Sequence, residues 1–281
     1  MILVADSGST KTSWVLAGND GISMRIGTAG INPAVQNIDD IVITMTDIAS
    51  ALPETPREIH FYGAGCRGEA RSSMLRLLHL VFEGEPQLEK IEVESDLLGA
   101  ARALFGDEEG IACILGTGSN SCLYDGNNIV ENIPPLGYIL GDEGSGAAIG
   151  KTFINALFKG RLPGWLQNEY FAETGQSYDI IIHRVYRRQC ANRFLASISK
   201  FIAKHMEVNE LTDIVEYNFE QFFDKNVCRY SRCDLPVAAV GSIAYVYQEI
   251  FMNVASAKGF HVSKILKEPI DAIVDYHLCH R

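Results

Sequence analysis

Several features of membrane, secreted and nucleic-acid-binding proteins are missing from this sequence. No apolar run approaches the ~20 residues that a helix needs to cross a bilayer. The seven cysteines are an odd number and lie scattered along the chain, so they do not suggest a disulfide framework. Met1–Asp6 has no basic segment before its apolar residues, unlike a signal peptide. These absences predict a reduced, cytoplasmic protein.

A surplus of basic residues is also absent. Lysine and arginine total 24 against 35 aspartates and glutamates, which gives a formal net charge of −11. Proteins that bind nucleic acids or anionic membrane surfaces need a basic face, so we expect neither partner. The fractions of hydrophobic residues (47%) and charged residues (21%) are those of a folded globular protein. A chain of 281 residues is long enough for two domains.

The strand and turn pattern of the N-terminus recurs in the second half of the chain. Ile2–Ala5 reads as a strand, and a polar turn, Asp6–Lys11, leads into a second strand at Thr12–Ala17. A shift of 110 positions places Ile2–Ala5 on Ala112–Leu115 and Gly8 on Gly118. A repeat of one supersecondary unit at this offset is typical of a duplicated two-domain fold.

The remaining patterns predict a mixed α/β protein with two domains, 1–108 and 109–281. Apolar positions at helical spacing dominate 165–225, which we interpret as a helical insertion in the second domain. The sequence leaves open whether a C-terminal helix at 269–281 packs back on the first domain. Further strands are expected at 22–26, 60–62, 91–94, 235–240 and 260–267, and further helices at 36–52, 74–82, 95–105, 146–160, 243–257 and 270–278.

Two hairpin turns have the composition of phosphate-binding loops. The first, Asp6–Thr12, combines glycine, serine and threonine between two strands, so backbone N–H groups and hydroxyls share one concavity. Asp6 can hold Mg²⁺ through water, and Lys11 supplies positive charge. The second turn, Gly116–Asn120, repeats this chemistry at the equivalent place in the second half. A structural turn without a ligand is the alternative for each.

Three other segments carry candidate functional residues. Asp142 and Glu143 lie adjacent among glycines, where they can bind sugar hydroxyls or a metal, or simply precede a helix. Asp96 follows a strand and begins a helix, where a carboxylate stays ionised as a general base requires; Ser95 or Asp96 as a helix N-cap is the alternative. Gly241-Ser242 turns from a strand into a helix, as adenosine-binding turns do.

Taken in order, these motifs resemble the sugar kinase, Hsp70 and actin superfamily. Within it the sequence resembles the BadF/BadG/BcrA/BcrD ATPase family, and in particular its N-acetylglucosamine kinase-like members. Residues 116–120 and 141–145 match that pattern almost letter for letter, and Gly30-Ile31-Asn32 resembles the loop that carries an acceptor-binding asparagine. The resemblance implies an actin-like ATPase fold of two duplicated ribonuclease H-like domains, with a nucleotide cleft between them.

The resemblance also implies an activity and a set of residue roles. The expected reaction transfers the γ-phosphoryl group of ATP to a hydroxyl of N-acetylglucosamine or a related amino sugar, with Mg²⁺ as cofactor and Asp96 as general base. A homodimer is the implied assembly. The nucleotide would be bound by Gly8, Ser9, Thr10, Lys11, Gly116, Thr117, Gly118, Ser119, Gly241 and Ser242. The sugar would be bound by Asn32, Asn120, Gly137 and Asp142, and Asp6 would hold the Mg²⁺ ion through water.

Two departures from the family pattern fall on the sugar side. Pro33-Ala34 follow Asn32 where an aromatic residue is expected, and Pro134-Pro135-Leu136 stand where a tryptophan is expected. The sequence therefore leaves open which sugar is the acceptor and which hydroxyl is phosphorylated, while the nucleotide motifs are intact.

Two other functions remain as alternatives. One is an ATPase that activates a 2-hydroxyacyl-CoA dehydratase-type enzyme and carries an iron–sulfur cluster, for which Cys228 and Cys233 form the only close cysteine pair. The other is a regulator that binds ATP and a sugar without catalysis.

Two further clusters are interpreted as structural. His277–His280 predicts a solvated helix end rather than a metal site. The arginines between Arg184 and Arg193 predict a solvated helix face, with an anionic ligand or a partner subunit as the alternative.

Overall fold

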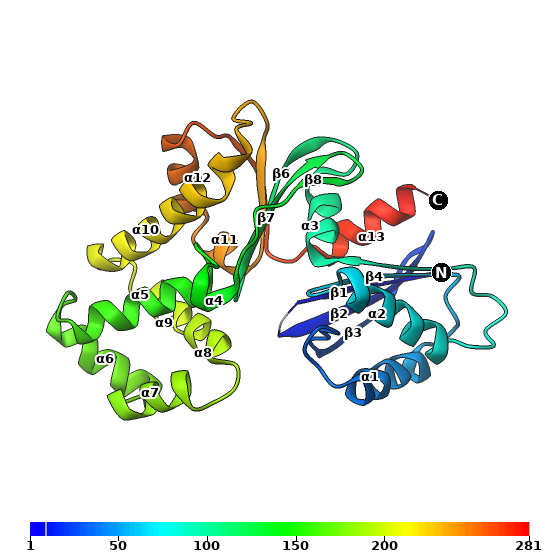
Figure 1. The fold of residues 1–281 in the computed structure, drawn as a ribbon, viewed down its shortest axis with the longest axis horizontal. Coiled ribbons are helices and arrows are strands. Elements are labelled where there is room, and N and C mark those ends of the chain that lie inside the picture. Colours follow the sequence, from blue (N-terminus) through cyan, green and yellow to red (C-terminus); the bar gives the residue numbers. More distant parts are fainter. Residues whose placement is uncertain (9, 281) are drawn as a thin grey trace. The chain divides into compact units, whose positions relative to one another are not determined.

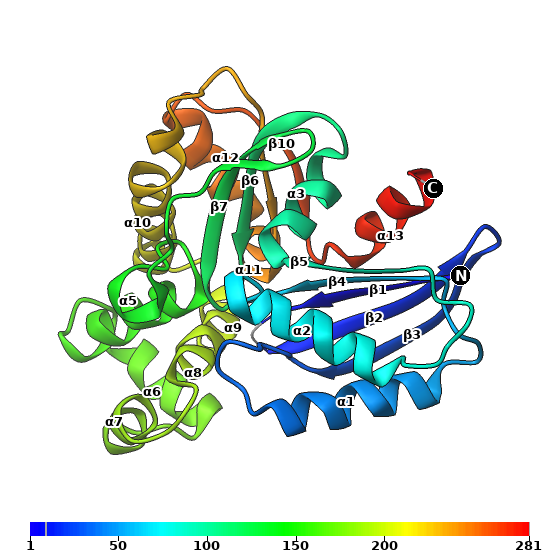
Figure 2. The same ribbon diagram turned by 45° about the vertical axis from the view of Figure 1, so that its right-hand side comes forward.

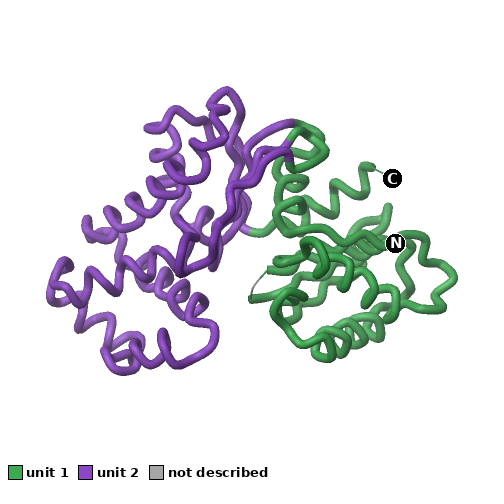
Figure 3. Tube along the Cα trace, in the orientation of Figure 1, with its two compact units in different colours: residues 1–108, 125–129, 268–281 green, residues 109–124, 130–267 purple. Residues whose placement is uncertain are grey.

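The computed structural model describes residues 1–8 and 10–280 and divides them into two compact units (Figure 1, Figure 3). Unit 1 consists of residues 1–108, 125–129 and 268–281, and unit 2 consists of residues 109–124 and 130–267. Ser9, one of the residues expected at the nucleotide phosphates, lies outside the described residues. Each unit contains one five-stranded sheet.

The sheet of unit 1 has the strand order β3-β2-β1-β4-β5. Its elements are β1 (Ile2–Ser7), β2 (Lys11–Gly18), β3 (Gly21–Ala29), α1 (Ile38–Ala51), β4 (Glu58–Gly63), α2 (Gly68–Val81), β5 (Lys90–Ser95), α3 (Asp96–Phe105) and, from the far end of the chain, α13 (Ile270–Cys279). Strands β1 to β3 form an antiparallel meander, whereas β4 and β5 run parallel to β1.

The parallel strands place three chain segments at one edge of this sheet. Ser7 on β1 pairs with Gly63 on β4, which in turn pairs with Ser95 on β5. Each is the last residue of its strand. The loops that follow these carboxyl ends are where open α/β sheets bind ligands. Asp6, near the end of β1, and Asp96, directly after β5, therefore lie at the same edge of the sheet although they are far apart in the sequence.

Helices cover both faces of this sheet (Figure 2). α1 and α2 pack on one face through apolar side chains that recur at helical spacing, such as Ile41, Met45, Met74 and Leu78, all of which are buried. α3 and α13 pack against each other on the other face, where α13 contacts β1 and β2. Met74 is completely buried.

Unit 2 repeats the sheet of unit 1, with the strand order β10-β9-β6-β7-β8. Its strands are β6 (Glu109–Leu115), β7 (Ser119–Asp125), β8 (Ile129–Glu131), β9 (Val237–Val240) and β10 (Val262–Leu266). Both sheets have the same order: the first three strands of the unit are neighbours in sequence order, and its fourth and fifth strands lie on the other side of the first. The duplicated two-domain α/β fold that the sequence predicts is thus confirmed.

The helices of unit 2 build a separate apolar core around its sheet. They are α4 (Gly137–Leu140), α5 (Gly146–Phe158), α6 (Gly164–Thr174), α7 (Tyr178–Tyr186), α8 (Ala191–Ser197), α9 (Ser199–Lys204), α10 (Asn209–Lys225), a 3₁₀ turn (Val227–Tyr230), α11 (Ser242–Val246) and α12 (Gln248–Ala257). Phe219 and Phe223 of α10 pack against Phe251 of α12, with ring centroids 5.4 and 5.2 Å apart. None of the described helices is both long and apolar enough to cross a membrane.

The structure differs from the sequence prediction at two helices. The helix expected at 74–82 begins earlier, at Gly68. The sequence did not predict its first turn because the residues there are polar and show no apolar periodicity. The helix expected at 243–257 is divided at Tyr247, which leaves helical angles. Its hydroxyl donates a hydrogen bond to the Ser199 carbonyl at 2.7 Å, a tertiary contact that no local pattern predicts.

The prediction of a solvated helix end at His277–His280 is wrong for His277. This side chain of α13 is 8% exposed and is stacked on His60 of β4. His280 is exposed and contacts the carboxylate of Asp107 at 2.9 Å. The prediction failed because α13 packs on the first sheet, about 200 or more positions along the chain from its partner strands there.

Candidate active site

Asp6 and Asp96 interact electrostatically at the carboxyl edge of the unit 1 sheet. Burial and, second to it, the neighbouring negative charge of Asp96 raise the pKa of Asp6 to about 7. Lys11 opposes this shift, and Glu268 adds to it. Two carboxylates share one partly buried region here, which is a place where a cation is electrostatically favoured.

Asp96 begins α3 without acting as its N-cap. The cap is Ser95, whose hydroxyl oxygen accepts the N–H of Leu98 at 3.2 Å. The carboxylate of Asp96 accepts the N–H of the adjacent Leu97 at 2.9 Å. Burial raises the pKa of Asp96, and the Leu97 N–H and the positive charge of Arg67 counteract that shift. The result is an oriented carboxylate whose basicity is above normal, as proton abstraction requires.

The hairpin between β1 and β2 closes tightly. The Gly8 N–H donates to the Lys11 carbonyl at 3.0 Å, and the Thr10 carbonyl accepts the N–H of Gly30 at 3.1 Å. The Lys11 ammonium lies 2.5 Å from the carboxylate of Glu268, which stands two residues before the start of α13. Lys11 is therefore paired with a carboxylate while its side chain remains exposed. An exposed ammonium group of this kind can leave Glu268 and bind another anion instead.

The loop that carries Asn32 is fastened to this hairpin. The hydroxyl of Ser7 donates to the Ile31 carbonyl and accepts the Ile31 N–H, both at 2.9 Å. Thr12 shares this network through a 2.6 Å contact between its hydroxyl and that of Ser7. Asn32 itself accepts the N–H of Ala34 at 3.0 Å. The candidate acceptor loop and the candidate phosphate hairpin therefore form one hydrogen-bonded assembly.

The loop after β4, residues 64–67, also belongs to this site, although sequence reasoning missed it. Gly65 has φ = +78°, and a Cβ there would lie 2.3 Å from the Asn32 side-chain oxygen. Arg67 at the end of the loop is a cation that opposes the burial-driven rise in the pKa of Asp96. The available signal was Gly63 and Gly65, which lie at the end of a buried strand and just beyond it, because loops at that place lie at the ligand-binding edge.

In unit 2 the structure brings the second glycine turn together with the acidic loop. The Gly116 N–H donates to the Gly118 carbonyl at 2.9 Å, which closes the turn between β6 and β7. The first N–H groups of α5 then donate to this turn: Gly146 to the Gly116 carbonyl at 2.9 Å and Ala147 to the Thr117 carbonyl at 3.2 Å. The two motifs thus form one rigid constellation.

Asp142 lies directly over Gly118. A Cβ on Gly118 would come within 2.9 Å of the Asp142 carboxylate, so only glycine fits without displacing it. Asp142 is 9% exposed and adopts φ = +53°. Burial raises its pKa to about 6, and the nearby Ser119 N–H partly offsets that effect. The neighbouring Glu143 points elsewhere and pairs with Lys225 at 3.2 Å. Of the two acids, Asp142 is the one held within the turn.

Gly241 and Ser242 lie beside the same turn. Gly241 has φ = +124°, and a Cβ on it would meet the Leu115 carbonyl at 2.2 Å and the Gly116 nitrogen at 3.3 Å. The adenosine-type turn of the sequence therefore packs on the backbone that begins Gly116–Ser119. Ser242 starts α11 and is exposed.

Asn120 and Gly137 lie near this constellation with specific local roles. The Asn120 side-chain oxygen accepts the amide of Asn132 at 2.9 Å, which orients the asparagine on β7. Gly137, with φ = +73°, starts the short helix α4, and its carbonyl accepts the Gly141 N–H at 2.8 Å. α4 thereby sets the backbone entry into the Asp142 loop.

One buried cluster has the composition of a metal site but not its geometry. His60, Glu92 and His277 are the one group of three metal-capable side chains among residues 1–8 and 10–280. The two imidazole rings stack with centroids 3.6 Å apart and planes at 20°, so no ion can lie in both ring planes. Arg102 also donates to Glu92 at 3.0 Å, which neutralises the carboxylate. No cysteine belongs to this group.

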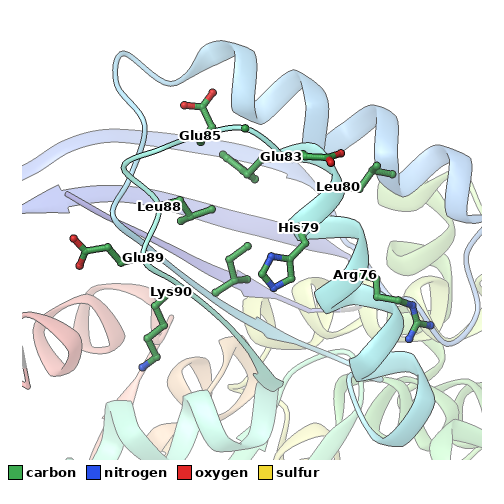
Figure 4. A pocket seen from close by; sticks show the side chains of 11 residues that line it. Arg76, His79, Leu80, Glu83, Glu85, Leu88, Glu89 and Lys90 are labelled. Atoms are coloured by element: carbon green, nitrogen blue, oxygen red, sulfur yellow. The ribbon is translucent and has the colours of Figure 1, made fainter.

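A hollow beside α2 contains none of the candidate site residues (Figure 4). It has a volume of about 490 Å³ and lies between the end of α2 and the start of β5. Acidic and basic side chains line it in mixture, and Figure 4 shows Glu85, Glu89, Lys90 and Arg76 pointing away from one another. It therefore offers no concentrated charge to a ligand.

Comparison with solved structures decides the family. A candidate N-acetylglucosamine kinase from Porphyromonas gingivalis is 43% identical to this chain, with a TM-score of 0.95 and 99% of each chain covered. The chain belongs to the N-acetylglucosamine kinase-like family. Its enzyme class, a sugar kinase, agrees with the expectation from the sequence motifs. No protein-family model matches the chain, and no curated protein matches it.

More distant structures share the fold of this N-acetylglucosamine kinase-like protein. A second candidate N-acetylglucosamine kinase, from Chromobacterium violaceum, is 17% identical with a TM-score of 0.73 and 98% of each chain covered. A ROK family glucokinase from Streptomyces griseus, in complex with glucose and AMPPNP, is 12% identical with a TM-score of 0.56, covering 97% of this chain and 98% of that one.

Proposed function

We propose that this protein transfers the γ-phosphoryl group of ATP to a hydroxyl of N-acetylglucosamine or a related amino sugar. The observation that carries the proposal is Asp96, a partly buried carboxylate of raised pKa fixed at the start of α3 by the Ser95 cap. A general base must accept the hydroxyl proton as the new phosphate ester bond forms. Membership of a sugar kinase family and the glucokinase with bound AMPPNP support ATP as the donor.

Each unit supplies backbone groups suited to phosphate oxygens. In unit 1 these are the N–H groups and hydroxyls of Gly8, Thr10 and Lys11; Ser9 is included in this proposal from the sequence alone. In unit 2 they are those of Gly116–Ser119, with Gly241 and Ser242 beside them as the adenosine turn. Backbone donors in glycine turns hold transferring phosphates without the reorganisation that a flexible side chain needs.

The donor set around Asp6 fits Mg²⁺. A carboxylate whose pKa is raised by burial and by a second carboxylate is stabilised when a divalent cation neutralises it. When bound, Mg²⁺ would neutralise charge on the phosphate oxygens. Asp6 would orient the ion through water, and Lys11 would exchange its Glu268 partner for phosphate.

The sugar side is proposed to consist of Asn32, Asn120, Gly137 and Asp142. Asp142 is the acid that the Gly118 turn fixes, and a carboxylate of this kind accepts hydrogen bonds from sugar hydroxyls. Asn32 is positioned by Ser7, Ile31 and Gly65. Pro33 and Leu136 stand where the family pattern has aromatic residues. The preferred amino sugar is therefore to be identified by experiment.

An ADP-release assay with Mg²⁺ and ATP, run against amino sugars and neutral hexoses, tests the proposal. We expect turnover that depends on one N-acetyl hexosamine and is much weaker with neutral hexoses. ATP binding without sugar-dependent ADP release from any member of the series would overturn it, and would favour the non-catalytic regulator. The iron content of the purified protein tests the iron–sulfur activator alternative, for which Cys228 and Cys233 are the only close cysteine pair in the sequence.

A further inference from the structure

Two arginines near the start of α2 lie one helical turn apart but have different surroundings. Arg71 is fastened to β5, since its Nε donates to the Val93 carbonyl at 2.6 Å and its Nη2 donates to the Glu94 carboxylate at 2.5 Å. Arg67 is exposed, and no ion pair engages it in the part of the chain that the structure describes. Arg71 thus holds α2 on the sheet, whereas the guanidinium of Arg67 is available to a ligand.

The register of the sheet places Arg67 beside Asp96. β4 and β5 are parallel and α2 connects them, so α2 runs back along the sheet from the end of β4. Arg71 lies against Glu94, near the end of β5. One helical turn is about 5.4 Å and one strand residue about 3.3 Å, so Arg67 lies roughly one to two residues farther along, where β5 ends and Asp96 follows. The positive charge of Arg67 opposes the burial-driven rise in the pKa of Asp96, which agrees with this position.

The backbone of Arg67 is held on both sides. Its N–H donates to the Gly65 carbonyl at 2.8 Å, and its carbonyl accepts two N–H groups from the first turn of α2 at 3.2 and 3.4 Å. A Cβ on Gly65 would lie 2.3 Å from the Asn32 side-chain oxygen, so the same short loop packs against the candidate sugar-binding asparagine. Arg67 therefore belongs to the edge of unit 1 that carries both the candidate base and the candidate acceptor loop.

We propose that Arg67 is a further catalytic residue, whose guanidinium binds the γ-phosphoryl group while it is transferred beside Asp96. The inference rests on the proposed phosphoryl transfer and adds a residue to it. A base that takes the acceptor proton lies within hydrogen-bond distance of the reacting oxygen, and the phosphorus atom lies next to that oxygen. A cation beside the base can therefore reach the phosphoryl oxygens, to which a guanidinium donates two parallel hydrogen bonds.

Arg67 itself gains and loses no covalent bond in this step. The bond from the acceptor oxygen to phosphorus forms as the bond from phosphorus to the β-phosphate oxygen breaks, which releases ADP. The hydroxyl proton passes to the carboxylate of Asp96. Arg67 donates hydrogen bonds throughout and stabilises the negative charge that the phosphoryl oxygens carry in the transition state.

Substitutions at position 67 test the contact through turnover. Arg67→Gln removes the charge, and we expect kcat for sugar-dependent ADP release to fall roughly 10²-fold or more, with little change in the KM for the sugar. Arg67→Lys keeps the charge without the planar group and should recover part of the loss. The control is Arg76→Gln, because Arg76 is exposed on the same helix, hydrogen-bonds to Ser73 at 2.9 Å and should be replaceable without loss of kcat.

Binding without turnover tests the contact a second time. Calorimetry measures the affinity of the full chain for ADP with Mg²⁺, with and without aluminium fluoride, which imitates a phosphoryl group in transfer; no sugar is added. We expect aluminium fluoride to tighten ADP binding at least fivefold in the natural chain and less than twofold in Arg67→Gln. ADP and Mg²⁺ alone should bind both chains equally.

The outcomes separate this inference from the proposed function. Tightening by aluminium fluoride that is absent from the natural chain, or that survives in Arg67→Gln, would overturn the contact even if the natural chain phosphorylates a sugar. A loss of kcat in Arg67→Gln that disappears at alkaline pH would also overturn it, because Arg67 would then act only by keeping Asp96 ionised. Tightening that depends on Arg67 in a chain without sugar-dependent turnover would support the contact and contradict the proposed acceptor.

Discussion

The imidazole rings of His60 and His277 stack with their centroids 3.6 Å apart, although 217 positions separate them in the chain. The His277 ring also contacts the hydroxyl of Tyr62 at 2.7 Å. These contacts fasten α13 to β4, on the face of the sheet that α3 shares. They place Glu268, the partner of Lys11, at the entrance to the candidate phosphate hairpin.

Acid should weaken this attachment. Burial lowers the pKa of His277 to about 3, against about 6.5 in an unfolded chain. The unfolded chain therefore binds this proton more tightly, so the stability is fully present above pH 6.5 and is lost as the pH falls toward 3. Between pH 7 and pH 5 the loss from this group is about 2 kcal/mol. Urea titrations at the two pH values measure it.

The variant His277→Gln isolates this contribution. It keeps a polar group opposite Tyr62 but cannot take up the proton, so its free energy of unfolding should depend less on pH than that of the natural chain. His79→Gln, at an exposed position on α2, is the control and should leave the pH dependence unchanged. Identical pH dependence in the natural chain and in His277→Gln would contradict this role of His277.

The cap of α3 should affect catalysis as well as stability. Ser95→Ala removes the bond to the Leu98 N–H and should cost about 1 kcal/mol in free energy of unfolding. Because Asp96 follows Ser95 directly, kcat should also fall roughly tenfold or more through misplacement of the carboxylate. The comparison variant is Asn37→Ala. The Asn37 side chain caps α1 in the same way, by accepting the Asp39 N–H.

These two capping variants separate positioning from folding. Both should lose a similar free energy of unfolding, yet only Ser95→Ala should lose kcat. Thermal unfolding and ADP release measure the two effects on the same preparations. An equal loss of kcat in Asn37→Ala would assign the effect of Ser95 to general destabilisation.

Gly118 should control the acceptor side. A methyl group at Gly118 would meet the Asp142 carboxylate at 2.9 Å and push it from its place, so Gly118→Ala should raise the KM for the sugar roughly tenfold. Gly164→Ala is the control, because its Cβ would meet nothing within 4 Å. Steady-state kinetics with the sugar varied at saturating ATP measures the change. An unchanged sugar KM in Gly118→Ala would argue against Asp142 as a sugar-binding residue.

The Mg²⁺ requirement should depend on pH through Asp6. Its pKa, raised to about 7 by burial, leaves the carboxyl protonated below neutral pH in the absence of the ion. Since Mg²⁺ favours the ionised form, half-saturation should need about tenfold more Mg²⁺ for each pH unit below 7 and should level off above it. Asp6→Asn should remove this dependence, and Asp20→Asn, in an exposed turn, should preserve it.

The sequence was most informative where function resides in short segments. Glycine turns after apolar strands predicted both hairpins, and a polar residue after a strand predicted Asp96 at the start of a helix. The strand and turn pattern that begins at Ile2–Ala5 recurs at Ala112–Leu115. It predicted the duplicated fold because a repeated supersecondary unit builds a similar sheet in each half of the chain.

Long-range contacts explain what the sequence could not predict. The pair Lys11–Glu268, the position of Asp142 over Gly118 and the burial of His277 each join segments that no local pattern relates. Gly65 and Arg67 were missed for a similar reason. Their importance lies in what they touch, Asn32 and Asp96, and touching depends on the register of β1, β4 and β5.

The role of Asp96 as general base is the central claim, and one comparison tests it most directly. ADP release in the presence of the preferred amino sugar is measured for the natural chain, Asp96→Asn and Glu94→Gln, with ATP binding measured in parallel by calorimetry. We predict that Asp96→Asn loses roughly 10²- to 10⁴-fold in kcat and still binds ATP, whereas Glu94→Gln retains activity. Near-normal turnover in Asp96→Asn would contradict the assignment.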